Sequence, residues 1–141
     1  MSDPVPRYCV GIDLGTTNSA VSYVDSTARS RKVRDFQVPQ VVGPGLVEAR
    51  DTLPSFHYEA AKGEFPSGAL RLPWDAEAAS HAVGVFARDH GATVPGRVVA
   101  SAKSWLCHPG VDRTAPLLPL HGAPAVHRLS PVAVSARYLG H

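Results

Sequence analysis

The ten residues GIDLGTTNSA, from Gly11 to Ala20, constrain this chain more than any other stretch of its sequence. The overlapping segment RYCVGIDLG, residues 7–15, has no polar interruption after Arg7 until Asp13. This pattern predicts a central strand that is buried on both faces. The following segment NSAVSYVDS alternates in the manner of a second strand. Only a few residues separate the two, so the sequence predicts a β-hairpin with a tight turn.

The residues of this turn suit a metal-bound polyphosphate. A carboxylate at the end of a buried strand, here Asp13, is well placed to hold a hydrated divalent cation. Gly15 lets backbone N–H groups approach an anion, and Thr16 and Thr17 add hydroxyl donors. A tight hairpin that uses Asp and Thr merely as turn residues explains the same pattern. The residues of the turn leave both interpretations open.

The turn differs from the two commonest phosphate-binding motifs. A P-loop requires Gly-x-x-x-x-Gly-Lys-Ser/Thr, and a dinucleotide fingerprint requires Gly-x-Gly-x-x-Gly leading into a helix. Neither pattern is present in the sequence. A phosphate site at this turn would therefore use a strand–turn–strand geometry.

Further along, RKVRDFQVPQVV, residues 31–42, predicts a third strand in which Pro39 indicates an edge or an end. TLPSFHYEA, residues 52–60, predicts another extended segment. VFARDHG, residues 85–91, predicts a short helix that Gly91 stops. RVVASAKSWLCH, residues 97–108, predicts an amphipathic helix. Its apolar face comprises Val98, Val99, Ala102, Trp105 and Leu106, with Lys103 at the margin.

The end of the sequence, LSPVAVSARYLGH, predicts a helix with Ser130 as the N-cap and Pro131 at its first position. We expect this helix to have nothing to pack against, which would place a cut inside a domain. The predicted organisation is one incomplete domain over residues 1–141.

Several stretches resemble one known family. GIDLGTTNSAV resembles the first phosphate motif of the actin-like ATPase superfamily, and more narrowly the opening of DnaK-type, seventy-kilodalton heat-shock chaperones. Asn18 and Ser19 favour that branch over the sugar kinases, which resemble DxGTTSxR, and over the bacterial actins, which resemble DLGTANT. DTLPSFHY, SAKSWL and LSPVAVSARYL resemble later family segments in the same order. Departures at Asp51, Leu53 and Ser104 indicate a divergent bacterial-type member.

The resemblance implies an α/β fold: the first lobe of an actin-like, ribonuclease-H-like ATPase domain, with a mixed sheet, β-hairpins and flanking helices. It implies ATP and Mg²⁺ as ligands. Lys103 would lie near the γ-phosphate and orient the attacking water, and Thr16 would contact the phosphates and assist proton handling. Gly15, Thr17 and Asn18 would shape the cradle, and Asp13 would hold Mg²⁺ through water. From composition alone, Lys103 is a surface lysine at a helix margin.

The function implied is the ATP-binding and ATP-hydrolysing domain of a DnaK-like chaperone, with unfolded polypeptides and cochaperones as partners of the intact protein. The activity of the intact protein would be ATP hydrolysis. Because the second lobe would be missing, we expect this fragment to bind ATP weakly and to hydrolyse essentially none. Two alternatives from the same superfamily stay open: a sugar-kinase-like phosphotransferase and a non-enzymatic, actin-like assembly protein.

Composition and residue spacing argue against several other classes of protein. The net charge is +2 and the charges are scattered, with one basic cluster at residues 29–34 that predicts a solvated surface turn rather than a nucleic-acid site. No stretch approaches the ~20 apolar residues of a membrane span. Cys9 and Cys107 are predicted to be buried, unpaired thiols in a reducing cytoplasm. The seven histidines do not show the spacing of metal ligands. The Gly-x-Ser-x-Gly motif of many serine hydrolases is also absent from the sequence.

Overall fold

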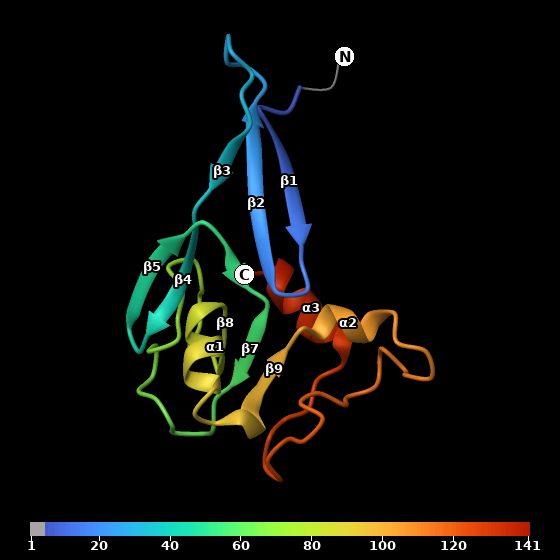
Figure 1. Cartoon of the computed structure of the whole chain (residues 1–141). Coiled ribbons are helices and arrows are strands. Elements are labelled where there is room, and N and C mark those ends of the chain that lie inside the picture. Colours follow the sequence, from blue (N-terminus) through green and yellow to red (C-terminus); the bar gives the residue numbers. More distant parts are fainter. Residues whose placement is uncertain (1–4) are drawn as a thin grey trace.

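The computed structural model describes residues 5–141 and begins with the predicted hairpin (Figure 1). Strands β1 (Tyr8–Leu14) and β2 (Asn18–Asp25) pair antiparallel, with Leu14 opposite Ser19 at the turn. Strand β3 (Arg34–Phe36) adds to the other side of β2, and β6 (Leu53–Pro54) pairs with the beginning of β2. The hairpin prediction is confirmed.

Two smaller sheets complete the β structure. Strands β4 (Val38–Gly43) and β5 (Leu46–Arg50) form a separate hairpin. In the third sheet, β7 (Phe56–Glu59) lies between β8 (His81–Val83) and β9 (Val98–Ala100). All the pairings between strands among residues 5–141 are antiparallel, so the expected mixed sheet is wrong. Short turns join β1 to β2 and β4 to β5, and such connections favour antiparallel pairing.

Three α-helices accompany the sheets. Helix α1 (Val85–Gly91) ends at Gly91 as predicted, and a 3-10 turn (Pro95–Arg97) leads from it toward β9. Helix α2 (Ala102–Leu106) follows β9. Helix α3 (Pro131–Leu139) starts as predicted, because the Ser130 hydroxyl accepts a 3.0 Å hydrogen bond from the Ala133 amide. Within residues 5–141, no helix combines the length and the apolar character needed to cross a bilayer.

Two segments that are each predicted to be one continuous element are divided in the structure. The predicted strand over residues 31–42 is broken at Gln37, between β3 and β4. The predicted helix over residues 97–108 is wrong in its first half, where Val98 and Val99 belong to β9 and pair with β7. Two adjacent β-branched residues fit a strand as well as a helix face, and pairing with β7 decides between them.

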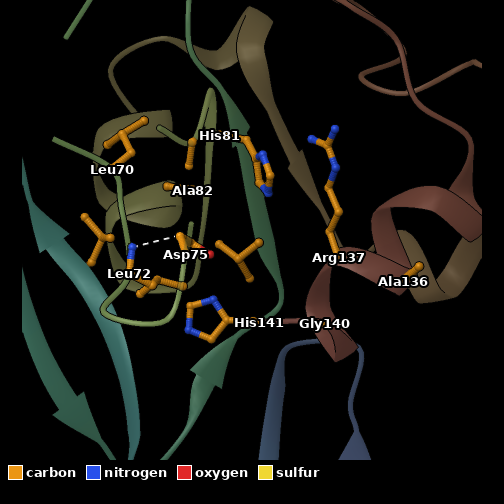
Figure 2. Close-up of a pocket in the computed structure, with 12 residues that line it drawn as sticks. Leu70, Leu72, Asp75, His81, Ala82, Ala136, Arg137, Gly140 and His141 are labelled. Atoms are coloured by element: carbon orange, nitrogen blue, oxygen red, sulfur yellow. Dashed lines mark hydrogen bonds between the residues drawn. The ribbon is translucent and has the colours of Figure 1, made fainter. Parts of the chain in front are cut away.

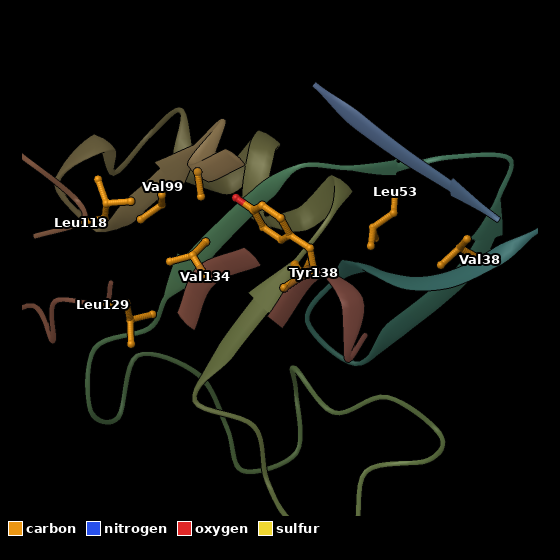
Figure 3. Close-up of a cluster of buried hydrophobic side chains, with 9 residues drawn as sticks. Val38, Leu53, Val99, Leu118, Leu129, Val134 and Tyr138 are labelled. Atoms are coloured by element: carbon orange, nitrogen blue, oxygen red, sulfur yellow. The ribbon is translucent and has the colours of Figure 1, made fainter. Parts of the chain in front are cut away.

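One hydrophobic core lies between α3, β9 and the start of β4 (Figure 3). Val134 and Tyr138 of α3 are almost completely buried against it. The expectation that the last helix has nothing to pack against is therefore wrong. The cluster consists of Val38, Leu53, Val83, Val99, Ala102, Leu118, Leu129, Val134 and Tyr138.

A second core lies beneath α1, and a buried glutamine fixes its geometry. The Gln40 side-chain amide donates to the Thr52 carbonyl at 2.9 Å, and its oxygen accepts from the Val85 amide at 2.9 Å. The Val85 amide lies in the first turn of α1 and therefore has no acceptor within the helix, so Gln40 supplies the missing acceptor. The apolar members of this core are Val41, Tyr58, Leu70, Leu72, Ala82, Phe86 and Ala87.

The first strand is less buried than its sequence predicts. β1 is an edge strand, and Val10 and Ile12 remain 60% and 57% exposed. The prediction of a central strand buried on both faces is therefore wrong, because within residues 5–141 no strand pairs with its outer side. Cys9 and Cys107 are unpaired as predicted, but both are exposed rather than buried.

Polar groups beside the first core form a buried cluster. The Arg137 guanidinium donates to the His57 imidazole Nε2 at 2.6 Å and to the Glu59 carboxylate at 2.8 Å. Burial, followed by the charge of Arg137, lowers the pKa of His57 to about 2. The same causes lower the pKa of His81, which stacks on His57, to about 4. Both rings are therefore neutral near pH 7, and the 3.6 Å approach of His57 to Glu59 is not an ion pair.

We predict that acid destabilises the fold through these two histidines. The unfolded chain protonates them as the pH falls through about 6.5, whereas the folded chain keeps His81 neutral to about pH 4 and His57 to about pH 2. Unfolding then takes up protons, so the free energy of unfolding is highest above pH 6.5 and falls below it. Each histidine contributes at most about 1.4 kcal/mol per pH unit.

Urea denaturation at a series of pH values measures this slope. His81→Gln should make the slope shallower between about pH 6 and pH 4, since one of the two proton uptakes is removed. The exposed His127 provides the control, because His127→Gln should leave the slope unchanged. Equal slopes for all three proteins would show that His81 does not contribute to the loss of stability in acid.

Candidate functional site

The turn between β1 and β2 is too tight for any residue but glycine at position 15. A Cβ atom on Gly15 would lie 2.0 Å from the Asn18 carbonyl oxygen, far inside contact distance. Thr16, Thr17 and Asn18 are exposed at the tip of this turn, and Asp13 is exposed on the last part of β1. The sequence therefore places a compact row of polar groups on the surface.

A buried serine holds this turn in place. Ser55, between β6 and β7, is only 1% exposed. Its hydroxyl donates to the Gly15 carbonyl at 2.8 Å, and its backbone amide donates to the Thr17 carbonyl at 2.8 Å. The carbonyl groups of the turn therefore face the protein, which leaves the threonine side chains toward solvent.

The same serine connects the turn to both C-terminal helices. Its carbonyl oxygen accepts a hydrogen bond from the Ser101 amide at 3.2 Å and from the Tyr138 hydroxyl at 3.0 Å. Ser101 precedes α2 and has φ of 54°, a left-handed conformation that is uncommon for serine. This backbone reversal starts α2 beside the turn, as Figure 1 shows.

The predicted residues are brought together to different degrees. Gly15, Thr16, Thr17 and Asn18 are contiguous, and Lys103 is exposed on the first turn of α2, two residues after the Ser101 contact. Within residues 5–141, no cluster of three or more His, Cys, Asp or Glu side chains could hold a metal ion by itself. Asp13 is therefore at most one protein ligand of a metal ion at this turn.

Sequence analysis did not assign a role to Ser55, Ser101 or Tyr138. Ser55 and Ser101 lie in the quoted stretches DTLPSFHY and SAKSWL, but no local signal indicates that they bond to each other. Tyr138 lies on the buried face of α3, and its hydroxyl is the polar atom that a buried tyrosine needs to satisfy.

The turn exposes groups that could donate hydrogen bonds to an anion and accept them from a hydrated cation. The hydroxyls of Thr16 and Thr17 form no hydrogen bond with residues 5–141, so they are free to donate to phosphate oxygens. The Asp13 carboxylate is exposed and can accept from the waters of a hydrated Mg²⁺. Lys103 supplies a positive charge from the neighbouring helix.

A separate pocket of about 370 Å³ lies between α3 and the segment before β8 (Figure 2). Arg137 of α3 and His81 of β8 line it, together with Asp75 and His141. None of the sequence-predicted site residues contributes to it. Arg137 is already bonded to Glu59 and His57, so the pocket offers no free cation for a phosphate.

Comparison with known proteins adds no family to these observations. No protein-family model, no curated protein and no solved structure matches the chain.

We predict that Ser55 rigidifies the turn. Ser55→Ala removes the donor to the Gly15 carbonyl but keeps the backbone bond to Thr17, so it should lower the free energy of unfolding by about 1–2 kcal/mol. Hydrogen exchange of the Gly15–Asn18 amides should accelerate by more than this global loss explains. Ser22→Ala, which removes an exposed contact with Asp35, is the control and should cost little. Unchanged exchange at the turn would contradict the assigned role.

Proposed function

We propose that this chain contributes the phosphate-binding part of an actin-like ATPase domain of the DnaK type. The observation that carries the proposal is the set of hydrogen bonds from Ser55, which join the Gly-Thr-Thr turn to the start of the Lys103 helix. Three segments that resemble the family in sequence, residues 11–21, 51–58 and 101–106, therefore meet in space. The small α/β architecture with antiparallel sheets supports the proposal without distinguishing it from other folds.

Each side chain would have a defined part at this site. Thr16 and Thr17 would donate hydroxyl hydrogen bonds to phosphate oxygens, and the cationic Lys103 would offset negative charge and orient a water molecule. Asp13 would hold the water shell of a magnesium ion. When bound, the magnesium ion would neutralise part of the phosphate charge.

The assignment to the chaperone branch rests on residues 18 and 19 and on the order of the similar segments. In such a protein, nucleotide hydrolysis would control the closure of two lobes around the ligand. Unfolded polypeptides and cochaperones would be partners of the intact protein. Within this chain, the testable part is the recognition of magnesium nucleotide by the turn and by α2.

We predict that millimolar Mg-ATP shifts the backbone amide NMR signals of Gly15–Asn18 and Ser101–Lys103 in the 141-residue protein. Thr16→Val keeps the shape of the side chain but removes its donor, and should weaken binding about tenfold because a hydrogen bond to a charged group is worth about 1.5 kcal/mol. Lys103→Met should weaken binding of ATP more than binding of adenosine, since adenosine carries no phosphate.

Matched controls separate this site from nonspecific attraction. Lys62→Met removes an exposed lysine from the turn after β7, and should leave the shifts unchanged. Asp13→Asn should reduce the difference between titrations with and without magnesium. If the turn and α2 signals do not move, or move equally with Lys62→Met and Lys103→Met, the proposed function is wrong.

A further inference from the structure

The hydroxyl group of Tyr138 is a polar group inside the first core. The side chain belongs to α3 and is only 3% exposed. Figure 3 shows its ring extending from α3 across the core, with the hydroxyl oxygen directed away from the helix. A buried hydroxyl group is stable only where it has a hydrogen-bond partner, so the partner shows which part of the fold Tyr138 holds.

The partner is the Ser55 carbonyl oxygen, to which the Tyr138 hydroxyl donates at 3.0 Å. The same oxygen accepts from the Ser101 amide at 3.2 Å, so both of its lone pairs are used. The hydroxyl and the amide of Ser55 hold the Gly-Thr-Thr turn. One buried residue therefore receives α3 and the start of α2 on its carbonyl and the turn on its donors.

The first residue of α2 also faces the Tyr138 oxygen. Burial raises the pKa of Tyr138, and the Ala102 backbone amide beside the phenol oxygen opposes this shift. The Ala102 amide lies in the first turn of α2, where amides have no acceptor within the helix. Ala102 is completely buried in the same core as Tyr138, and Lys103 is the next residue.

The backbone at this junction has a conformation that needs support. Among residues 5–141, Ser101 is the only residue other than glycine with a positive φ, at 54°. A left-handed conformation is unfavourable for serine and persists where the surrounding contacts enforce it. The Ser55 carbonyl binds the amide of Ser101, and the Tyr138 oxygen faces the next amide along the chain. Tyr138 therefore helps to set the direction in which α2 begins.

We propose that Tyr138 is a positioning residue of the phosphate site, whose hydroxyl fixes Lys103 relative to the Gly-Thr-Thr turn. The inference rests on the proposed function and names a residue that acts on the same site from the core. Tyr138 touches no ligand and acts through Ser55 and through the start of α2. Because its contacts are buried, they do not depend on which surfaces another part of the protein covers.

The first test uses the 141-residue protein without nucleotide. Tyr138→Phe keeps the ring in the core and removes only the hydroxyl. Hydrogen exchange of the Ser101 and Ala102 amides should accelerate about fivefold beyond the loss of global stability measured by urea denaturation, since one buried hydrogen bond is worth about that factor. The Gly15–Asn18 amides should change less, because the hydroxyl and the amide of Ser55 still hold the turn. Unchanged exchange at Ser101 and Ala102 would overturn the proposal.

The second test is a double-mutant cycle on the dissociation constant of Mg-ATP, measured from the NMR signals of the turn. Tyr138→Phe should weaken binding about threefold, because a residue that acts through a neighbour has a moderate effect on a site. In a Lys103→Met background the same change should have no further effect, since the side chain that it positions is gone. Equal weakening in both backgrounds would indicate a general structural loss and would contradict the positioning role.

Tyr58→Phe is the matched control. It removes the same group from the second core, where the completely buried Tyr58 donates to the Glu64 carboxylate at 2.6 Å. This variant should be less stable than the wild type but should bind Mg-ATP with the same affinity. If Tyr58→Phe and Tyr138→Phe weaken binding equally, any loss of stability has that effect and the assignment of Tyr138 is wrong.

The failure of this inference differs from the failure of the proposed function. A wild-type chain whose turn signals do not respond to Mg-ATP would refute the proposed function, and the positioning role with it. A wild-type chain that binds Mg-ATP, with Tyr138→Phe indistinguishable from Tyr58→Phe, would leave the proposed function in place and overturn only the role of Tyr138.

Discussion

The hydrogen bonds of Ser55 are the interaction on which the rest of this structure depends. Through four bonds, this buried residue joins the turn of the first hairpin, the start of α2 and the buried face of α3. Without them, the exposed turn and the exposed Lys103 would be separate surface features. With them, residues almost ninety positions apart form one corner, whose polar groups point to solvent.

Turns and helix ends that are marked by short sequence motifs were predicted correctly. The Gly-Thr-Thr turn and the cap at Ser130 each satisfy a backbone requirement within a few residues, so no tertiary information is needed. Gly91 ends α1 as predicted, but a Cβ atom there would lie 2.5 Å from the Val98 side chain, so packing also requires this glycine. The candidate site could be predicted only as a set of separate motifs. That Ser55 bonds to both the turn and Ser101 depends on sheet order, which no single segment specifies.

Predictions that depended on long-range packing were wrong. Val98 and Val99 continue a helical apolar face in the sequence, but β7 captures them as a strand. The last helix was expected to have nothing to pack against, yet its Val134 and Tyr138 lie in the first core. The apolar run of β1 suggested burial on both faces, because hydrophobicity reports what a strand can bury and not whether a partner is present. Cys9 is exposed for the same reason.

The exposed end of β1 bears on the proposed function. Asp13 is exposed at the end of an edge strand and makes no ion pair within residues 5–141. Its position on the face opposite Ile12 keeps it clear of the apolar side chains, so the carboxylate is available to a cation. Under the proposed function, a hydrated magnesium ion would meet that need.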